Sequence, residues 1–118
     1  MVHGNKNRTF GRPRNQRTAL VRGLAVSLIR DGKIKTTEAK AKELRPFIER
    51  LVTHGKKNTI AARRIVASRL GEPSATIIKK VFDELAPKFA SRQGGYTRVI
   101  KVGRTQAGRD EAVIEFVE

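Results

Sequence analysis

The hydrophobic pattern of this chain changes its period once. Up to Pro87 most large apolar residues recur three or four positions apart, as in helices that bury one face. From Tyr96 onward they alternate with polar residues or gather in β-branched runs, as in strands. The chain has 118 residues, too few for two domains that each bury a sizeable core. The pattern therefore predicts one α+β domain over residues 1–118, with helices first and a hairpin last.

The apolar stripes predict four helices. Their predicted bounds are residues 15–30, with the start between 15 and 18; residues 38–55, capped by Thr37 and closed by His54-Gly55; residues 59–70; and residues 74–87. Glycine inside a helix costs about 1 kcal/mol relative to alanine, so we expect another backbone to approach closely at Gly23.

In the third predicted helix the inward face is set by its apolar residues. Ala61 and Ile65 are expected to face the core, joined by Ala62, Val66 and Leu70.

Three short segments predict a small sheet. The segment 33–37 alternates around Ile34, 96–102 is rich in β-branched residues, and 112–117 alternates again. A glycine-containing loop joins the last two segments as a hairpin. We expect a mixed or antiparallel sheet of three strands with the helices on one side. The predicted order is helix, strand, three helices, then a two-stranded hairpin.

The positive charge is distributed very unevenly. The chain has 26 Lys and Arg against 11 Asp and Glu, a formal net charge of +15. Residues 1–70 hold 18 basic and 4 acidic residues, whereas residues 71–118 hold 8 and 7. Such an excess repels itself unless a polyanion supplies the counter-charge, and nucleic acid is the commonest one.

The first fifteen residues have too few apolar side chains to order themselves alone. They carry Lys6, Arg8, Arg12 and Arg14 and no acid. We interpret residues 1–15 as a basic arm that becomes ordered along a nucleic-acid backbone. The alternative is a solvated tail, which is common at chain ends.

Several classes of protein lose support. The chain has no cysteine, no apolar run of the length needed to cross a membrane and no apolar segment typical of a signal peptide. It has two histidines and no phosphate-binding, dinucleotide or zinc motif. We therefore expect an intracellular, cytoplasmic protein that is not an enzyme, with no metal, cofactor, small-molecule substrate or membrane partner.

Residues 60–85 raise an alternative function. Two predicted helices joined at Gly71 have the shape of a helix-turn-helix unit, which would make the protein a DNA-binding regulator. The second helix, however, has Lys79 and Lys80 each four residues before an acid, which is typical of a solvated face. A plain helical hairpin is the commoner structure.

The segment 87–98, PKFASRQGGYTR, combines glycine freedom with an aromatic ring between arginines. Gly94 and Gly95 allow a backbone to approach a partner, and Tyr96 beside Arg92 and Arg98 fits a stacking contact with RNA. An equally good interpretation is a tight turn into a strand with Tyr96 in the core.

The runs TTEAKAKELR and APKFASRQGGYTRVIKVG and the ending AVIEFVE closely resemble the bacterial large-subunit ribosomal protein seventeen family. The resemblance covers almost the whole chain. It implies a structural, non-catalytic protein of the large ribosomal subunit that binds its ribosomal RNA and supports subunit assembly. It also implies neighbouring ribosomal proteins as partners and a place on the solvent side near the exit of the peptide tunnel.

Transferred by position, the resemblance implies RNA contacts in three parts of the chain: the arm and first helix, the second helix, and the glycine loop. The residues concerned are His3, Lys6, Arg8, Arg12, Arg14, Arg17 and Arg22; Lys40, Lys42 and Arg45; and Arg92, Gly94, Gly95, Tyr96 and Arg98.

Overall fold

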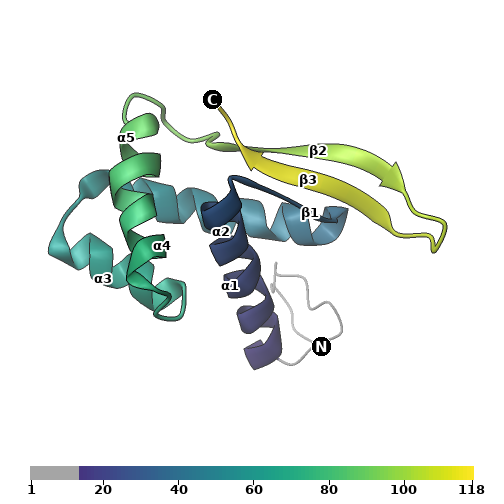
Figure 1. Ribbon diagram of the computed structural model, residues 1–118, viewed down its shortest axis with the longest axis horizontal. Helices are drawn as coiled ribbons and strands as arrows, with labels where there is room; N and C mark the ends of the chain where they lie inside the picture. Colours follow the sequence, from purple (N-terminus) through teal and green to yellow (C-terminus); the bar gives the residue numbers. More distant parts are fainter. Residues whose placement is uncertain (1–13) are drawn as a thin grey trace, which may run out of the picture.

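The structure, a computed structural model, describes residues 14–118 and forms one α+β unit (Figure 1). Its elements are α1 (Arg14–Asp31), β1 (Lys33–Thr37), α2 (Glu38–Lys57), α3 (Ile60–Arg69), α4 (Ala75–Lys80), η1 (Val81–Leu85), α5 (Ala86–Lys88), β2 (Thr97–Arg104) and β3 (Asp110–Phe116). The last three helical elements are continuous, so the predicted order of helix, strand, three helices and hairpin is confirmed.

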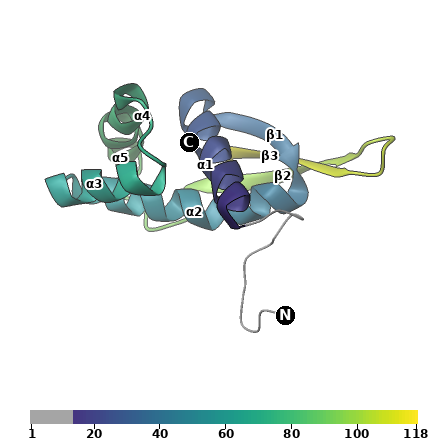
Figure 2. The ribbon, with the colours of Figure 1, turned by 90° about the horizontal axis from the view of Figure 1, so that it is seen from below.

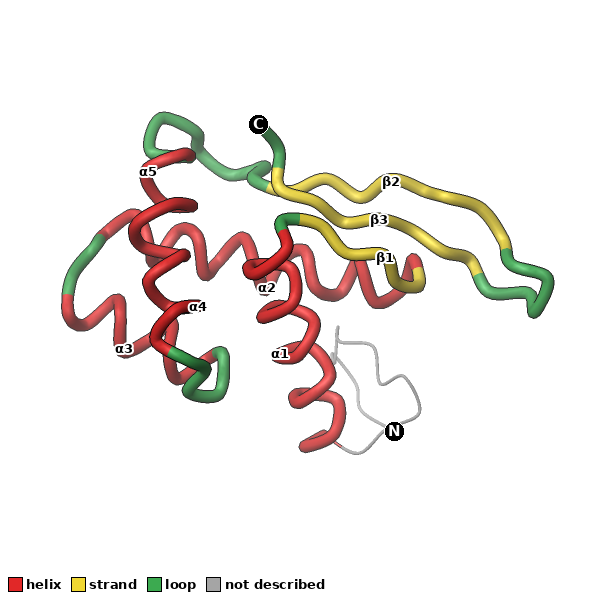
Figure 3. The backbone as a smooth tube through the Cα atoms, in the orientation of Figure 1, coloured by secondary structure: helices red, strands yellow, loops and turns green. Residues whose placement is uncertain are grey.

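The three strands form an antiparallel sheet in the order β1-β3-β2. In register, Ile34 of β1 lies opposite Ile114 of β3, which lies opposite Val99 of β2. A bulge between Lys101 and Gly103 shifts the register of β2. The β2–β3 hairpin continues past the helices and ends in a free loop (Figures 1 and 3). The sheet was predicted to be mixed or antiparallel, and it is antiparallel.

Helix α2 lies against one face of this sheet and contacts all three strands, α1 contacts β1, and α3 and α4 pack against other helices (Figure 2). Alternation along β3 turns Ala112, Ile114 and Phe116 into the core, while the residues between them are only partly covered. Helix α2 contributes the buried stripe predicted for it, which consists of Ala41, Leu44, Ile48, Leu51 and Val52. One core therefore joins helices and sheet.

Helix boundaries follow side-chain caps. The Thr37 hydroxyl accepts from the N–H of Lys40 at 3.3 Å, and that of Thr59 accepts from the N–H of Ala62 at 3.0 Å. The prediction that His54-Gly55 ends the second helix is wrong: α2 continues to Lys57, and Asn58 caps it in the left-handed region with φ 46°.

The predicted inward face of α3 needs correction. Ala62, Val66 and Leu70 are buried, but Ala61 is exposed and Ile65 is 38% exposed. Since 3.6 residues make a turn, Ala61 and Ile65 lie on the flank away from the residues that contact α2 and α4. Both groups of apolar residues fit helical spacing, so spacing alone does not distinguish them. Packing against the neighbouring helices buries Ala62, Val66 and Leu70 and leaves Ala61 and Ile65 outside.

A close neighbour was expected at Gly23, but the structure has one at Gly55 instead. A Cβ at Gly23 would meet no described atom within 4 Å, so the predicted close backbone approach is absent there. A Cβ at Gly55 would lie 3.1 Å from Cγ1 of Val81 and 3.5 Å from Cβ of Ala86. Gly55 thus lets α2 and the π-helical turn η1 pack closely.

Within residues 14–118, none of the helices combines the length and apolar character that crossing a bilayer requires.

Candidate nucleic-acid interface

The described carboxylates are largely engaged in ion pairs. Seven of them pair with a Lys or Arg side chain: Asp31, Glu38, Glu49, Asp83, Asp110, Glu111 and Glu115. Because the cations outnumber them, many basic side chains keep no ion-pair partner within residues 14–118. Four of these side chains, Arg22, Lys56, Lys80 and Arg92, donate to backbone carbonyls instead. The others are Arg14, Arg17, Lys33, Lys40, Arg50, Lys57, Arg64, Arg69, Lys79, Lys88 and Arg109. These side chains form the candidate interface for a polyanion.

The arm itself is not part of this geometry. The predicted contacts His3, Lys6, Arg8 and Arg12 lie outside the described residues. The predicted arm overlaps the described chain at residues 14 and 15, which form the first turn of α1 instead.

Along α1 the three predicted arginines have different surroundings. Arg14 is exposed at the start of the helix, and Arg17 is half-buried. The guanidinium of Arg22 reaches α3, where Nε donates to the carbonyl of Arg69 at 3.0 Å and Nη2 to that of Ser68 at 3.5 Å. Arg22 therefore closes the end of α3, a role that helical periodicity does not reveal.

The predicted contacts on α2 also differ. Lys40 is half-buried and has no ion-pair partner within the described part of the chain. Lys42 pairs with Glu38 at 2.8 Å, the arrangement expected from their spacing of four. Glu38 also meets Lys101 of β2 at 3.5 Å. The hydrogen bond from Lys42 lowers the pKa of Glu38, with further help from Lys101, although desolvation opposes them.

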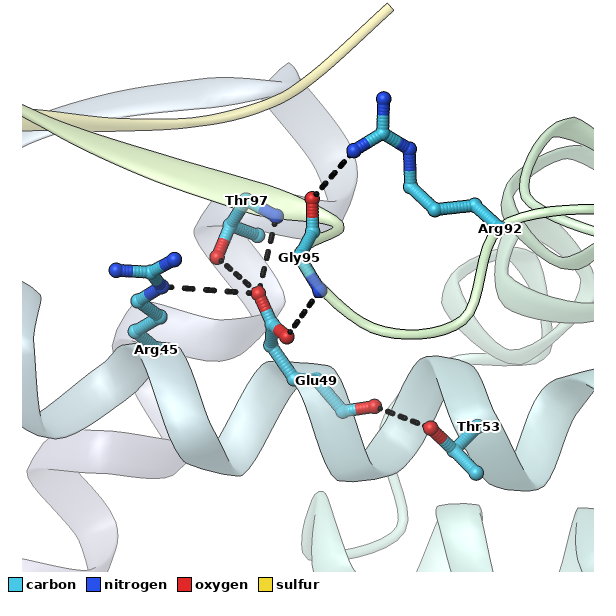
Figure 4. A network of polar contacts seen from close by, with 6 residues as sticks. All are labelled: Arg45, Glu49, Thr53, Arg92, Gly95 and Thr97. Carbon is cyan, nitrogen blue, oxygen red and sulfur yellow. Dashed lines mark hydrogen bonds and ion pairs between the residues drawn. The ribbon is translucent and has the colours of Figure 1, made fainter.

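Glu49 organises the glycine loop and was not predicted (Figure 4). Its carboxylate accepts from the N–H of Gly95 at 3.0 Å, and from the N–H and hydroxyl of Thr97 at 3.1 and 3.0 Å. Arg45 lies 3.7 Å from the same carboxylate. An acid between Arg45 and Arg50 on a basic helix is the signal that could have singled it out.

The loop is also braced from its own side. Nη1 of Arg92 donates to the carbonyl of Gly95 at 3.2 Å, and Nζ of Lys56 donates to the carbonyl of Arg92. Gly94 and Gly95 have φ values of 80° and 64°, a succession that side chains disfavour. Glycine here serves a sharp turn whose shape is fixed before any partner arrives.

Tyr96 lies in the core and is 2% exposed. Its ring centroid is 5.2 Å from that of Phe89, and its hydroxyl accepts from Nζ of Lys56 at 3.1 Å. Burial alone would raise the pKa of Tyr96, but hydrogen bonds from Thr53, the Gly94 backbone and Lys56 lower it overall. Of the two interpretations of the segment, the structure has the turn into a strand, and this ring offers no face to a base.

Arg98 projects from β2 on the side of the sheet away from the helices, where its side chain is 55% exposed. Its Nε donates to Glu115 of the neighbouring strand at 3.1 Å. Lys35 and Arg104 are likewise paired with carboxylates of β3 at 3.5 and 3.1 Å. Half of the cations of the sheet and its hairpin loop are thus paired with carboxylates of β3, whereas Lys33 and Arg109 have no carboxylate partner among the described residues.

The α2–α3 end carries a second group of unpaired cations. Lys57, Arg64 and Arg69 are exposed there without carboxylate partners among the described residues. His54 is nearby, and its pKa is lowered by desolvation first and then by the charges of Lys57 and Arg69. Arg50 and His54 also line a shallow hollow of about 200 Å³ beside Gly94.

The DNA-regulator alternative loses its structural basis. Nζ of Lys80 donates to the carbonyl of Arg30 at 2.7 Å, which turns it toward α1. The would-be recognition helix α4 continues into η1, whose apolar residues are buried and whose exposed residues are Asp83 and Glu84. Carboxylates on this stretch would repel DNA phosphates.

No group of three potential metal ligands converges within the described residues. Most of the carboxylates of these residues form ion pairs, and that of Glu49 also anchors the glycine loop. Fold and surface together define a class: a small, strongly basic structural protein, with an α+β core and free charge on its helical faces.

Comparison with known proteins identifies the member of that class. The family model described as Ribosomal protein L17 matches residues 20–117. The large ribosomal subunit protein bL17 of Persephonella marina is 49% identical over 120 residues, which cover 100% of this chain and 96% of the relative. That of Exiguobacterium sp. is 50% identical over 112 residues, covering 92% and 96%. That of Gemmatimonas aurantiaca is 48% identical over 118 residues, covering 99% and 98%.

The chain belongs to the ribosomal protein L17 family. Proteins of this family are structural parts of the ribosome, and the chain is accordingly not an enzyme. The resemblance drawn from the runs TTEAKAKELR and APKFASRQGGYTRVIKVG is confirmed.

Proposed function

We propose that this protein is a structural constituent of the bacterial large ribosomal subunit, where it binds the large ribosomal RNA and supports subunit assembly. The supporting observation is the surplus of cations that have no carboxylate partner among the described residues, most of them on the helices. RNA phosphates would supply the counter-charge that the chain lacks.

The mechanism is thermodynamic. Each phosphate neutralised by Lys or Arg releases a condensed counterion, and contacts at several points hold RNA segments in fixed relative positions. The rigid part is the core with its anchored loop, where Glu49 holds Gly95 and Thr97. Further phosphate contacts are assigned to the arm, residues 1–15, and include His3, Lys6, Arg8 and Arg12.

The proposed contact set keeps most of the predicted basic residues. Arg14, Arg92 and Arg98 are exposed. Arg17 and Lys40 are half-buried, and all five would reach phosphates. Lys42 and Arg45 would exchange a carboxylate partner for a phosphate. Gly94 and Gly95 would contribute backbone, whereas Arg22 and Tyr96 would act through the fold.

Binding to a large-subunit ribosomal RNA transcript at several salt concentrations tests the proposal. If about ten phosphates are engaged, the log–log salt slope should be roughly −7 to −9. A slope shallower than about −3 would contradict a broad electrostatic contact. Co-sedimentation of the chain with large subunits, but not with a genomic duplex library, separates this function from DNA regulation.

Removal of the arm tests its assigned part. Deleting residues 2–14 is expected to leave thermal unfolding cooperative while weakening RNA binding and subunit incorporation. Loss of the fold on deletion would show that the arm belongs to the core.

The place of the protein near the exit of the peptide tunnel, among neighbouring ribosomal proteins in the cytoplasm, also belongs to this proposal. The family membership supports it. Chemical crosslinking of intact subunits, followed by identification of the crosslinked neighbours, tests this placement.

A further inference from the structure

Helix α3 exposes a face that is not part of the contact set proposed above for α1, α2 and the glycine loop. Ile60 is 72% exposed and Ile65 38% exposed, although both are large aliphatic residues. Small or polar residues lie between them on the outer side, including Ala61 and Ser68, both exposed. Solvent-exposed aliphatic residues grouped on one short helix indicate a contact surface.

The charges on this helix select the kind of partner. Residues 60–69 contain three arginines and no acid. Arg63 is engaged inward, because its guanidinium lies 4.6 Å from the ring centroid of Phe82 and 3.9 Å from Asp83. Arg64 and Arg69 have no ion-pair partner among residues 14–118. The exposed face is therefore both aliphatic and cationic.

Residues next to α3 add to the positive charge of this face. Lys57 precedes α3 by three residues, and His54 lies close enough for Lys57 and Arg69 to lower its pKa. A protein partner would have to supply several carboxylates to this surface. An RNA helix supplies a phosphate row on each side of a shallow minor groove, with riboses between them that suit aliphatic contact.

We propose that the outer face of α3, made by Ile60, Ala61, Arg64, Ile65 and Ser68 with Arg69 at its end, docks across the minor groove of a helical segment of ribosomal RNA. The inference rests on the proposed function and adds a second contact region. Arg64 and Arg69 would bind phosphates, and Ile60 and Ile65 would cover riboses.

Helix α3 is tied to the same core as the other proposed RNA contacts. The β2–β3 hairpin and α3 lie at opposite ends of the molecule (Figures 1 and 2). Arg22 of α1 ties the end of α3 to the rest of the core, through the carbonyls of Ser68 and Arg69. An RNA segment held by α3 would thus be fixed relative to one held at the loop or the hairpin.

Matched substitutions test the charge. At 0.1 M salt, Arg64→Ala is expected to weaken binding to a large-subunit RNA transcript about three- to tenfold and to make the log–log salt slope shallower by about 1. Ile60→Ser is expected to weaken binding with the slope unchanged. Arg63→Ala, the adjacent but inward-facing arginine, should keep the slope. Thermal unfolding of Arg64→Ala should match the parent chain.

Directed cleavage tests the location. The chain has no cysteine, so Ser68→Cys and, separately, Gln106→Cys each provide one thiol for an iron–EDTA probe. The probe attached to Ser68→Cys should cleave both strands of an RNA helix, and the probe attached to Gln106→Cys should leave that helix intact.

The outcomes separate the two proposals. Cleavage from Gln106→Cys but none from Ser68→Cys would overturn the α3 surface and leave the proposed function standing. Normal RNA affinity of Arg64→Ala and Ile60→Ser with poor incorporation into subunits would assign the face to a protein neighbour instead. Failure of the parent chain to bind the transcript would overturn both.

Discussion

Glu49 on α2 holds Thr97 at the start of β2 with two hydrogen bonds to one carboxylate oxygen, at 3.1 Å from the N–H and 3.0 Å from the hydroxyl. The two residues are 48 positions apart in the chain. Thr97 is 2% exposed, so water cannot replace this acceptor without a change of structure. The bond therefore decides where the glycine loop meets the sheet.

Replacing Glu49 by Ala should lower the free energy of unfolding by about 2 kcal/mol, since it leaves buried donors of Thr97 without an acceptor. Denaturant unfolding measures the change, and amide exchange should accelerate at Gly95 and Thr97. Asp110→Ala is the control, because its pair with Arg104 is exposed on both sides and should contribute less than about 0.5 kcal/mol. Equal losses in the two variants would contradict the anchoring role.

Gly55→Ala and Gly23→Ala should change stability in opposite directions. At Gly55 the added methyl would press on Val81, at a cost of about 2 kcal/mol. At Gly23 it would meet no described atom and would favour the helix by about 1 kcal/mol. The melting temperatures of the two variants check this. A stabilising Gly55→Ala would show that α2 and η1 can separate without loss.

Arg22→Ala should destabilise the fold by about 1 kcal/mol, because it removes the donors to Ser68 and Arg69. RNA affinity of the folded variant should stay close to that of the parent. Arg17→Ala is the matched comparison on the same helix and should show the reverse, with unchanged stability and weaker RNA binding. If Arg22→Ala instead loses RNA affinity and keeps full stability, the prediction is wrong. The guanidinium of Arg22 would then leave the carbonyls of α3 and bind a phosphate when RNA is present.

Because of His54, stability should rise as the pH increases from its folded-state pKa through the higher unfolded value. Its folded-state pKa lies below the unfolded value, near 6.5, so the unfolded chain binds the proton more tightly. The contribution is complete above the unfolded pKa and is lost as the pH falls through the folded pKa. Denaturant unfolding across this range should show a flatter profile for His54→Gln.

Features that depend on short stretches of sequence were predicted well. The first strand, Lys33–Thr37, has the predicted bounds because its alternation is bordered by Gly32 and the capping Thr37. The buried stripe of α2 follows from its spacing. The family resemblance, carried by long runs of sequence, directed the function.

Features that depend on contacts between distant residues were not predicted. Glu49 meets its partners 46 and 48 positions away, and Arg22 meets Arg69 47 positions away. Gly55 was interpreted as a helix stop because glycine commonly ends helices, yet here it removes a Cβ where η1 approaches. The π-helical turn itself changes the period within Val81–Leu85, which a fixed helical repeat cannot anticipate.

The division between paired and unpaired cations also bears on how the protein first meets RNA. Lys35, Arg98 and Arg104 are matched with carboxylates on the sheet, while Lys57, Arg64 and Arg69 are not matched within the described chain. The unpaired side chains at the α2–α3 end would attract a polyanion during diffusion. Encounters that begin at this end would be favoured, and the association rate would fall steeply with added salt.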